Sequence, residues 1–312
     1  MGATRIPVAT LASGAELAIH VHEFRGGADG PTLGLCAAIH GDEVVSVEIL
    51  WRFSQRLPSL PFRGRVLMLP VANPLAIEGR TRHSPLDMLN MNRVFPGDPA
   101  GWVTERLAAA VTRHFLERVD VLVDLHAGGV YPTVDYVYIT NAEDLSRAFG
   151  SALLYRPQPG KAGTVFAGTS SGVTRDRGTP SVTVELGGGD VDQGAYVERG
   201  LRGIENVMHA LGMLDGPPAP RGRQTVVHEI VTVRPAHGGL LVPAAPALGR
   251  PVAGGAELGR VVSPYTLETI EVVRNPVARG VMILSHLTVD VVQPGDYGYM
   301  IGNLDDAEVE AG

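Results

Sequence analysis

The chain has 312 residues, of which 45% are hydrophobic and 19% are charged. This composition excludes an intrinsically disordered chain and is sufficient for a large buried core or two domains. The formal net charge of −7 argues against nucleic acid or an anionic membrane surface as the main partner. The single cysteine, Cys36, cannot form a disulfide within the chain, and its apolar neighbours predict a small buried residue.

The start of the chain carries no pattern of a targeting segment. Residues 1–10 lack a charged stretch that leads into a long apolar run, so the sequence predicts no signal peptide. No apolar run approaches the roughly 18 residues that a membrane-spanning helix needs. We therefore expect a cytoplasmic protein without a membrane partner. The sequence leaves open whether the chain forms a homo-oligomer.

The first two thirds of the chain alternate predicted strands with predicted helices, which is typical of a mixed, mostly parallel sheet flanked by helices. Apolar runs, some of them continuous enough for a strand covered on both faces, predict strands at residues 17–21, 32–39, 66–71, 119–125, 134–139 and 181–186. Amphipathic patterns predict helices from after residue 43 to about 57, at 102–118 and at 192–211. Residues 75–101 carry no regular period, and a stretch of that length indicates a functional loop.

The clearest predicted linker is Gly-Pro-Pro-Ala-Pro-Arg-Gly at residues 216–222. After it, short β-branched runs alternate with Gly and Pro turns and no helical pattern appears. We therefore predict an α/β catalytic domain at residues 1–215 and a smaller all-β domain at residues 223–312.

Candidate metal ligands follow two predicted strands, at the places where the active sites of open α/β sheets gather. His40 and Glu43 stand three residues apart in a strand-to-helix turn, and His126 ends another apolar strand. Two neutral imidazoles and one carboxylate leave an open position, which is the pattern of a catalytic zinc site. A histidine or glutamate at a strand end can also be an ordinary paired polar group, but the three together favour the metal. Asp124 is either a partner of a ligand imidazole or a cap of its strand.

A third strand end and the long loop supply groups for a hydrolytic reaction. Glu185 follows four strand-forming residues and precedes Leu and three glycines, which permit close backbone approach. We predict that Glu185 is a general base, and the alternative is a solvated carboxylate at a strand end. Guanidinium groups suit carboxylate binding and oxyanion stabilisation, although a solvated basic loop is the alternative. The polar residues of the loop are Arg80, Arg82, Asn90, Asn92 and Arg93.

Five separated motifs, in this order, resemble the succinylglutamate desuccinylase/aspartoacylase family of the zinc carboxypeptidase superfamily. They are His40-Gly-Asp-Glu43, Asn73-Pro74, Arg82 ahead of Asn90-Met-Asn92-Arg93-Val-Phe95-Pro96-Gly97, Asp124-Leu-His126 and Glu185-Leu-Gly-Gly-Gly, all within residues 30–215. Within the family, the Ser84-Pro85 and Asp87 insert and the Glu-Leu-Gly-Gly-Gly stretch are most similar to N-acetyl-diaminobutyrate deacetylases. The C-terminal segment, with His237-Gly-Gly and Gly259, is similar to the family's barrel-sandwich β domain, which overhangs the active site.

The resemblance implies a zinc carboxypeptidase-like fold and a zinc-dependent amidohydrolase, a deacylase that removes an acyl group from an N-acyl amino acid or a similar small amide. His40, Glu43 and His126 would be the ligands of one zinc ion per chain. Glu185 would activate the water, and Arg82 would polarise the scissile carbonyl.

The resemblance also implies a small-molecule substrate that carries a carboxylate, which Asn92 and Arg93 would hold. The sequence departs from the family pattern where some members bind a second carboxylate, so the acyl group and the amino acid are left open. The candidates for that role are Arg156, Arg175, Arg177, Tyr131, Tyr155, Tyr265 and Tyr297.

Three other functions are compatible with the same residues. A metallocarboxypeptidase would act on peptide C-termini, although an overhanging β domain would exclude long substrates. An ester hydrolase acting on a small carboxylate would use the same chemistry, and a non-catalytic protein would bind its ligand through the metal. A lipoyl or biotinyl carrier is excluded, because Lys161 is the only lysine and residues 162–312 contain none to modify.

Overall fold

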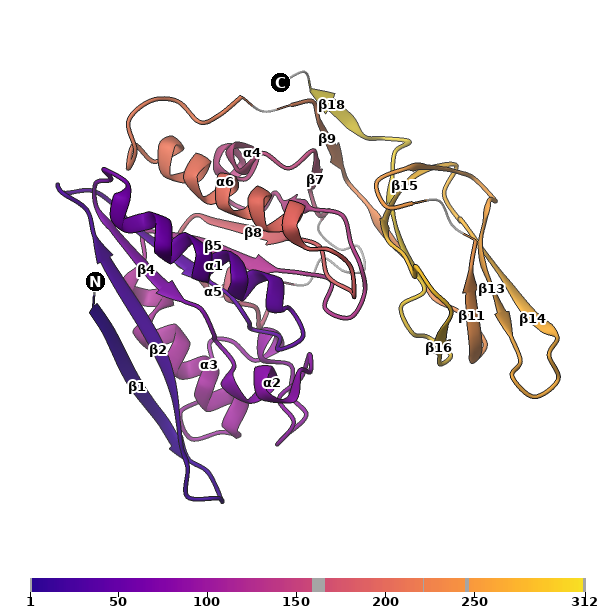
Figure 1. Ribbon diagram of the computed structural model, residues 1–312, viewed down its shortest axis with the longest axis horizontal. Coiled ribbons are helices and arrows are strands. Elements are labelled where there is room, and N and C mark those ends of the chain that lie inside the picture. The colour runs from indigo at the N-terminus through magenta and orange to yellow at the C-terminus, as the bar shows by residue number, and fades with distance from the viewer. Residues whose placement is uncertain (1, 159–165, 221, 245–246, 311–312) are drawn as a thin grey trace.

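The structure, a computed structural model, describes residues 2–158, 166–220, 222–244 and 247–310. Its centre is a ten-stranded mixed sheet with helices on both faces, and two smaller antiparallel sheets lie beside it (Figure 1). In spatial order the large sheet contains β1 (Gly2–Thr10), β2 (Glu16–Arg25), β4 (Arg65–Leu69), β3 (Thr32–Cys36), β5 (Val121–His126), β8 (Ser181–Glu185), β6 (Tyr136–Tyr138), β7 (Leu153–Tyr155), β9 (Gln224–Val227) and β18 (Glu308–Glu310). The central strands β4, β3, β5 and β8 are parallel to one another, which confirms the predicted fold class.

The helices form two layers, one on each face of the large sheet (Figure 1). They are α1 (Val44–Arg56), α2 (Pro74–Gly79), α3 (Val103–His114), α4 (Glu143–Phe149), α5 (Ser170–Asp176) and α6 (Gly194–Ala210), with short 3-10 turns at Leu57–Ser59, Met91–Arg93 and Leu116–Arg118. Among the described residues, none of the helices is long and apolar enough to cross a membrane.

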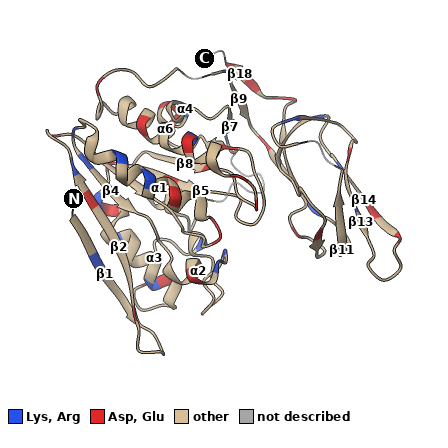
Figure 2. Ribbon diagram, in the orientation of Figure 1, with Lys and Arg blue, Asp and Glu red and all other residues tan. Residues whose placement is uncertain are grey.

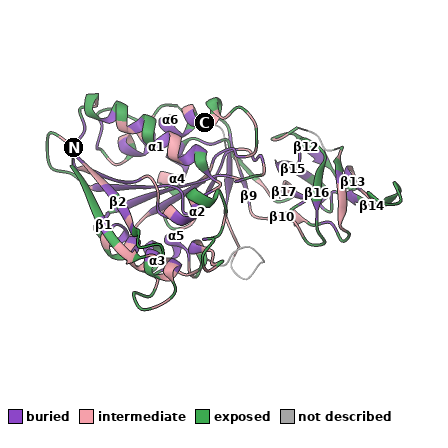
Figure 3. Cartoon of the chain, turned by 60° about the horizontal axis from the view of Figure 1, so that its bottom comes forward, coloured by how far each residue is buried: buried purple, intermediate pink, exposed green. Residues whose placement is uncertain are grey.

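Successive side chains of the central strands point to opposite faces of the sheet, so each helix layer packs on its own set of apolar residues. In β4, Val66 and Met68 pack with α1 and α6, whereas Leu67 and Leu69 pack with α3 on the other face. Figure 3 shows the resulting arrangement, in which buried strands lie between helices that expose their outer sides. Because Leu122 of β5 belongs to the α3 core, Asp124 and His126, two and four residues further along, also point to that face.

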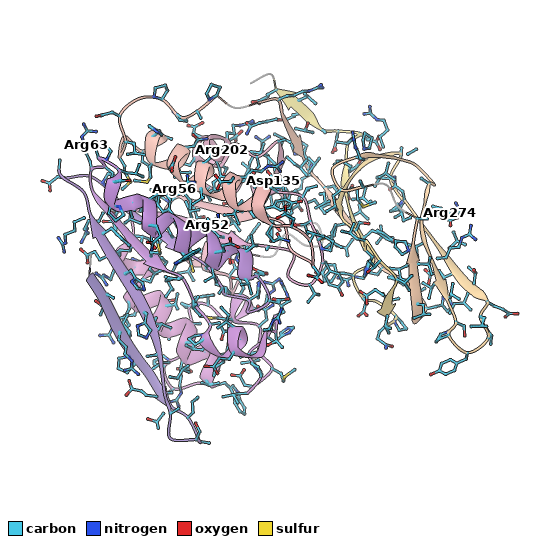
Figure 4. All side chains as sticks on the ribbon, viewed as in Figure 1. Arg52, Arg56, Arg63, Asp135, Arg202 and Arg274 are labelled. Atoms are coloured by element: carbon cyan, nitrogen blue, oxygen red, sulfur yellow. The ribbon has the colours of Figure 1, made fainter. Side chains whose placement is uncertain are left out.

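Helices α1 and α6 lie side by side on one face and are joined by ion pairs at their solvent-facing sides. Arg56 of α1 lies 3.3 Å from Glu198 and 3.5 Å from Glu205, both on α6. Figure 2 shows acidic and basic residues interspersed along the two helices, and Figure 4 shows Arg52 and Arg56 on α1. These half-exposed pairs add little stability, so apolar packing beneath them holds this layer in place.

The two smaller sheets build a separate apolar core in the C-terminal part of the chain. One contains β10 (Ile230–Val233), β17 (Tyr299–Asn303), β15 (Arg279–Leu284) and β12 (Pro251–Ala253); the other contains β14 (Thr269–Arg274), β13 (Glu257–Val262), β11 (Gly239–Pro243) and β16 (Asp290–Val292). Leu258, Val261, Tyr299 and Ile301 are fully buried between them.

Two strands that follow the predicted linker in sequence belong to the large sheet. Strands β9 and β18 lie within residues 223–312, yet β9 pairs with β7 and β18 pairs with β9 at the edge of the large sheet. The division into domains at residues 215 and 223 stays a prediction, and the structure adds that residues 224–227 and 308–310 extend the large sheet.

Several elements differ from the sequence predictions. The strand predicted at residues 32–39 ends at Cys36, because Ala38 adopts a φ of 50° and turns the chain out of the ladder. The stretch 75–101, predicted without regular structure, contains all of α2 after Pro74 and a 3-10 turn at Met91–Arg93. One of the β-branched runs after the linker, at residues 226–233, divides between β9 and β10, which belong to different sheets. Strands β1 and β7 and helices α4 and α5 were not predicted.

Candidate active site

The parallel strands bring four separated residues to one edge of the sheet. His40 and Glu43 lie between the end of β3 and the start of α1, and His126 is the last residue of the neighbouring strand β5. Glu185 is the last residue of β8 and stands opposite His126 in the parallel register. The register therefore determines which side chains meet, although they are up to 145 positions apart in sequence.

Glycines allow the backbone to approach closely around these residues. A Cβ on Gly41 would lie 1.9 Å from the backbone of Ala76, so only glycine fits between the two ligand candidates at this turn. Beyond the strand ends, the turns after β5 and β8 stay paired, with Gly128 N donating to Gly187 O at 2.8 Å. Gly188 has a φ of 116°, which is accessible to glycine and rarely to other residues.

His40, Glu43 and His126 form one buried cluster. Each side chain is at most 4% exposed, and the three potential ligand atoms lie within 4.8 Å of one another. The two carboxylate oxygens of Glu43 are divided between the rings: Oε1 lies 2.6 Å from His40 Nδ1 and Oε2 lies 2.9 Å from His126 Nδ1. The structure thus brings the three predicted metal ligands together.

The second nitrogen of each ring is held by a neighbouring oxygen acceptor. His40 Nε2 lies 3.1 Å from Asn90 Oδ1, and His126 Nε2 lies 3.2 Å from Asp124 Oδ2. If an ion were bound, an Nε2–H that donates outward would leave the Nδ1 lone pair of each ring available to that ion. Two imidazole nitrogens and a carboxylate, each with an outer partner, are the donor set that a borderline-soft divalent ion such as zinc accepts, so the residues present fit a metal.

Burial and neighbouring charges shift the pKa values of the cluster residues in opposite directions. Burial alone would raise the pKa of Glu43, but the adjacent His40 and His126 outweigh it and lower that pKa. Burial lowers the pKa of His40, which Glu43 only partly offsets. At His126 burial also acts to lower the pKa, but the charges of Asp124 and Glu43 raise it above the usual value.

Glu185 and Arg82 lie at the edge of the same cluster. Burial, followed by the negative charge of Glu43, raises the pKa of Glu185 to about 8. The guanidinium of Arg82 lies 3.3 Å from Glu43 Oε1, and its charge is stabilised by both Glu43 and Glu185. Because 42% of the Arg82 side chain remains exposed, this cation faces both the cluster and a molecule entering from solvent.

The remaining residues of the loop connect the cluster to α5. Asn92 Oδ1 accepts a hydrogen bond from Ser170 N at 3.0 Å, which leaves the amide NH₂ of Asn92 as its donor group. Arg93 is exposed, and its guanidinium donates to Asn92 O at 2.6 Å. Asn90, which the sequence shows only as one of the polar residues of the loop, supports His40 with its side chain.

A cavity of about 420 Å³ opens beside Glu43. It lies between the start of α1 and the glycine turns after β5 and β8, and its lining includes Asp42, Arg80, Gly129, Val130, Gly189 and Gln193. A larger cavity of about 650 Å³ lies around residues 57–63 and contains none of the predicted site residues. Glu43 is the predicted metal ligand in the lining of the cavity beside it, which includes neither His40 nor His126, and neither Arg82 nor Glu185.

The C-terminal sheets reach this edge of the large sheet through aromatic residues. Tyr131, from the turn after β5, lies 5.3 Å from the ring of His286 and 6.1 Å from that of Tyr297. Tyr297 is close enough to contribute to the electrostatic environment of Arg82, and Arg234 lies over its ring. Backbone bonds join the same parts, with Val134 N donating to Ile283 O at 2.9 Å.

The other residues suggested for a second carboxylate have other surroundings. Arg156 pairs with Glu143 and Glu308, and Tyr265 is 93% exposed in the turn between β13 and β14. The sequence did not indicate Ser170, whose hydroxyl donates to Asp124, because it follows a threonine and precedes another serine with no distinguishing pattern.

The family model for the succinylglutamate desuccinylase/aspartoacylase catalytic domain matches residues 29–211. The N-alpha-acetyl-L-2,4-diaminobutyric acid deacetylase of Halomonas elongata is 32% identical over 274 residues, which cover 83% of this chain and 75% of that protein. The chain belongs to the succinylglutamate desuccinylase/aspartoacylase family. This confirms the family that the sequence motifs indicate.

Solved structures of this family agree with the fold along nearly the whole chain. A succinylglutamate desuccinylase/aspartoacylase from Rhodobacter sphaeroides has a TM-score of 0.80 at 27% identity and covers 96% of this chain and 94% of its own. The product-bound ectoine utilization protein EutE (DoeB) from Ruegeria pomeroyi has a TM-score of 0.81 at 25% identity and covers 96% of this chain and 93% of its own.

In metal-free protein, Glu185→Gln is expected to stabilise the fold increasingly as the pH rises from about 5 to 9. The folded state raises the pKa of Glu185 to about 8, so the folded chain keeps a proton that the unfolded chain loses near the usual carboxyl value. The wild type therefore loses stability across this range, whereas glutamine does not titrate. Thermal unfolding midpoints at several pH values, with a chelator present, measure the difference. A difference that is constant with pH would contradict the raised pKa.

Proposed function

We propose that the protein is a zinc-dependent amidohydrolase that removes the acyl group from an N-acyl amino acid or a similar small amide carrying a carboxylate. The observation that carries this proposal is the convergence of two imidazole Nδ1 atoms and a carboxylate beside Glu185, whose pKa is raised. The family supports it, since its named members are deacylases.

One zinc ion per chain would be held by Nδ1 of His40, Nδ1 of His126 and the carboxylate of Glu43. A zinc ion in this position supplies Lewis acidity towards a carbonyl oxygen and lowers the pKa of water to about 7. Asn90 and Asp124 fix the orientation of the two rings before any ion binds, which keeps the donor atoms converged.

Glu185 acts as the proton carrier of the reaction. It takes a proton from the water that attacks the amide carbon and passes it to the nitrogen as the carbon–nitrogen bond breaks. The products are the carboxylic acid of the acyl group and the free amine. Without an ion, burial and the charge of Glu43 raise the pKa of Glu185 to about 8, and a cation held by the cluster would lower that pKa and favour the carboxylate that accepts the proton.

Arg82 stabilises the negative charge that develops on the carbonyl oxygen. Its guanidinium already lies beside Glu43, and the exposed part of the side chain faces entering molecules. Asn92 and Arg93 bind the carboxylate of the substrate, Asn92 through its free amide NH₂ and Arg93 through its exposed guanidinium.

We propose that residues 223–312 form the smaller domain that covers the active site beside the catalytic domain of residues 1–215. Support comes from the contact of Tyr297 with Tyr131 and from the Val134–Ile283 backbone bond, which place C-terminal residues next to the turn after β5. A site covered in this way favours a small substrate over a peptide. The first candidates are N-acetylated amino acids, the class for which the Halomonas elongata relative is named.

Protein purified without chelator is expected to contain about one zinc ion per chain, and His126→Ala much less, because the variant loses one of three ligands. Elemental analysis measures the content, and His20→Ala, an exposed histidine on β2, is the matched control. A wild type without metal that also fails to take up added zinc would remove the mechanism.

Glu185→Gln is expected to lower kcat by about 10²–10⁴-fold while zinc content stays at the wild-type level, because the amide cannot accept a proton. Steady-state hydrolysis of an N-acyl amino acid, measured beside the metal content, checks both parts. A variant that turns over at the wild-type rate would exclude Glu185 as the proton carrier.

A panel of N-acyl amino acids is expected to include good substrates, and peptides that end in the same amino acids are expected to be cleaved poorly. The reason is the proposed cover by residues 223–312, which would exclude a chain extending beyond the acyl group. Comparing kcat/KM across the two sets decides between a deacylase and a carboxypeptidase, and matched esters show whether the site also cleaves that bond. Preference for the peptides would favour the carboxypeptidase. Binding of these compounds without turnover would favour a non-catalytic protein.

A further inference from the structure

Ser170 lies behind the candidate metal centre and has no role in the proposed reaction. It is the first residue of α5 and is completely buried, as is Asp124, to whose Oδ2 its hydroxyl donates a hydrogen bond. The carboxylate that supports His126 is therefore itself held by a side chain from another element.

The hydrogen bonds of Asp124 with Ser170 and with His126 share one oxygen atom. Oδ2 accepts the Ser170 hydroxyl and also lies 3.2 Å from His126 Nε2. A carboxylate attached to a strand through its Cβ can still rotate about its last side-chain bond, and a second donor on the same oxygen removes that freedom. The orientation of Asp124 then determines the plane of the His126 ring and the direction of Nδ1, which lies 2.9 Å from Glu43.

The backbone of Ser170 is attached to the loop that carries the proposed substrate-binding residues. Its N–H donates to Asn92 Oδ1 at 3.0 Å, and Phe95 N donates to Gly168 O at 3.0 Å just before α5. A Cβ on Gly168 would lie 2.2 Å from Arg93 O, so the turn and the loop are in direct contact. Ser170 thus joins Asn92 to Asp124 through one residue.

The hydroxyl groups on either side of Ser170 have local partners. Thr169 Oγ1 donates to Phe166 O at 2.7 Å and accepts from Gly172 N at 2.9 Å, as a cap of α5. Ser171 Oγ lies 3.2 Å from Thr169 Oγ1. Ser171 is also buried, so it offers a control at the adjacent position that removes a hydroxyl of the same kind.

We propose that Ser170 is a positioning residue of the metal centre: its hydroxyl fixes Asp124, which orients His126 towards the metal, and its backbone N–H fixes this support to the substrate-binding loop. The inference rests on the proposed function in one respect, the presence of a metal at His40, Glu43 and His126. It adds a residue on α5 that touches neither the metal nor the substrate.

The test compares zinc affinity in Ser170→Ala and Ser171→Ala by competition with a chelator of known affinity. We expect the dissociation constant for zinc to rise about 10–100-fold in Ser170→Ala, as is usual when an outer partner of a metal ligand is lost, and to stay within about twofold in Ser171→Ala. In zinc-saturated protein, Ser170→Ala should lower kcat with KM near the wild-type value, because the backbone N–H that holds Asn92 is retained.

A second variant and a double-mutant cycle keep the test independent of folding defects. Ser170→Cys keeps a donor at the same position but donates weakly, so its zinc affinity should fall between those of the wild type and the alanine variant. In an Asp124→Asn background, Ser170→Ala should change the zinc affinity much less than it does alone, because its effect passes through the carboxylate.

Two results would overturn the inference. One is a zinc affinity of Ser170→Ala equal to that of Ser171→Ala, and the other is a loss that stays the same size in the Asp124→Asn background. A wild-type protein that binds no zinc would instead remove the proposed function together with the inference. Failure of the proposed function and failure of the inference alone are therefore distinguishable.

Discussion

A carboxylate buried between two imidazole rings is the constraint around which this site is built. Glu43 is 2% exposed and keeps its charge only because His40 and His126 contact its two oxygens. A buried ion without partners costs several kcal/mol, so every group around it must be paired and held. Asn90 and Asp124 meet this requirement at the outer side of each ring, and Arg82 does so at the open side.

The same constraint separates the roles of the two glutamates. Glu43 has cationic or donor groups on both oxygens, and its pKa falls. Glu185 lies at the neighbouring strand end with the negative charge of Glu43 beside it, and its pKa rises. One sheet edge therefore holds a permanently ionised carboxylate, suited to binding a cation, and a second one that exchanges a proton near neutral pH. Their positions relative to the histidines, and not their residue type, produce the difference.

Much of the centre could be predicted because each residue follows a continuous apolar strand. His40, His126 and Glu185 stand at or just after such strands, and parallel strands bring those ends to one edge. The pairing of β9 and β18 with the large sheet could not be predicted, since it joins segments far apart and each strand has four residues or fewer. Ser170 could not be predicted for a similar reason. Nothing in Thr-Ser-Ser distinguishes this serine, and only the folded chain brings its hydroxyl to Asp124 of β5.

The arrangement assigns chemistry and selectivity to different parts of the chain. Strands β3, β5 and β8, or the residues just after them, carry the metal-ligand candidates and Glu185, and their packing on both faces leaves little tolerance for change. The lining of the cavity comes instead from the start of α1 and from turns, with Val130 after β5 and Gly189 after β8. Turns at the surface accept substitutions that a core does not. A chain with this division can alter which acyl group or amino acid it accepts while the buried centre stays the same, which is why the motifs indicate the reaction more sharply than the substrate.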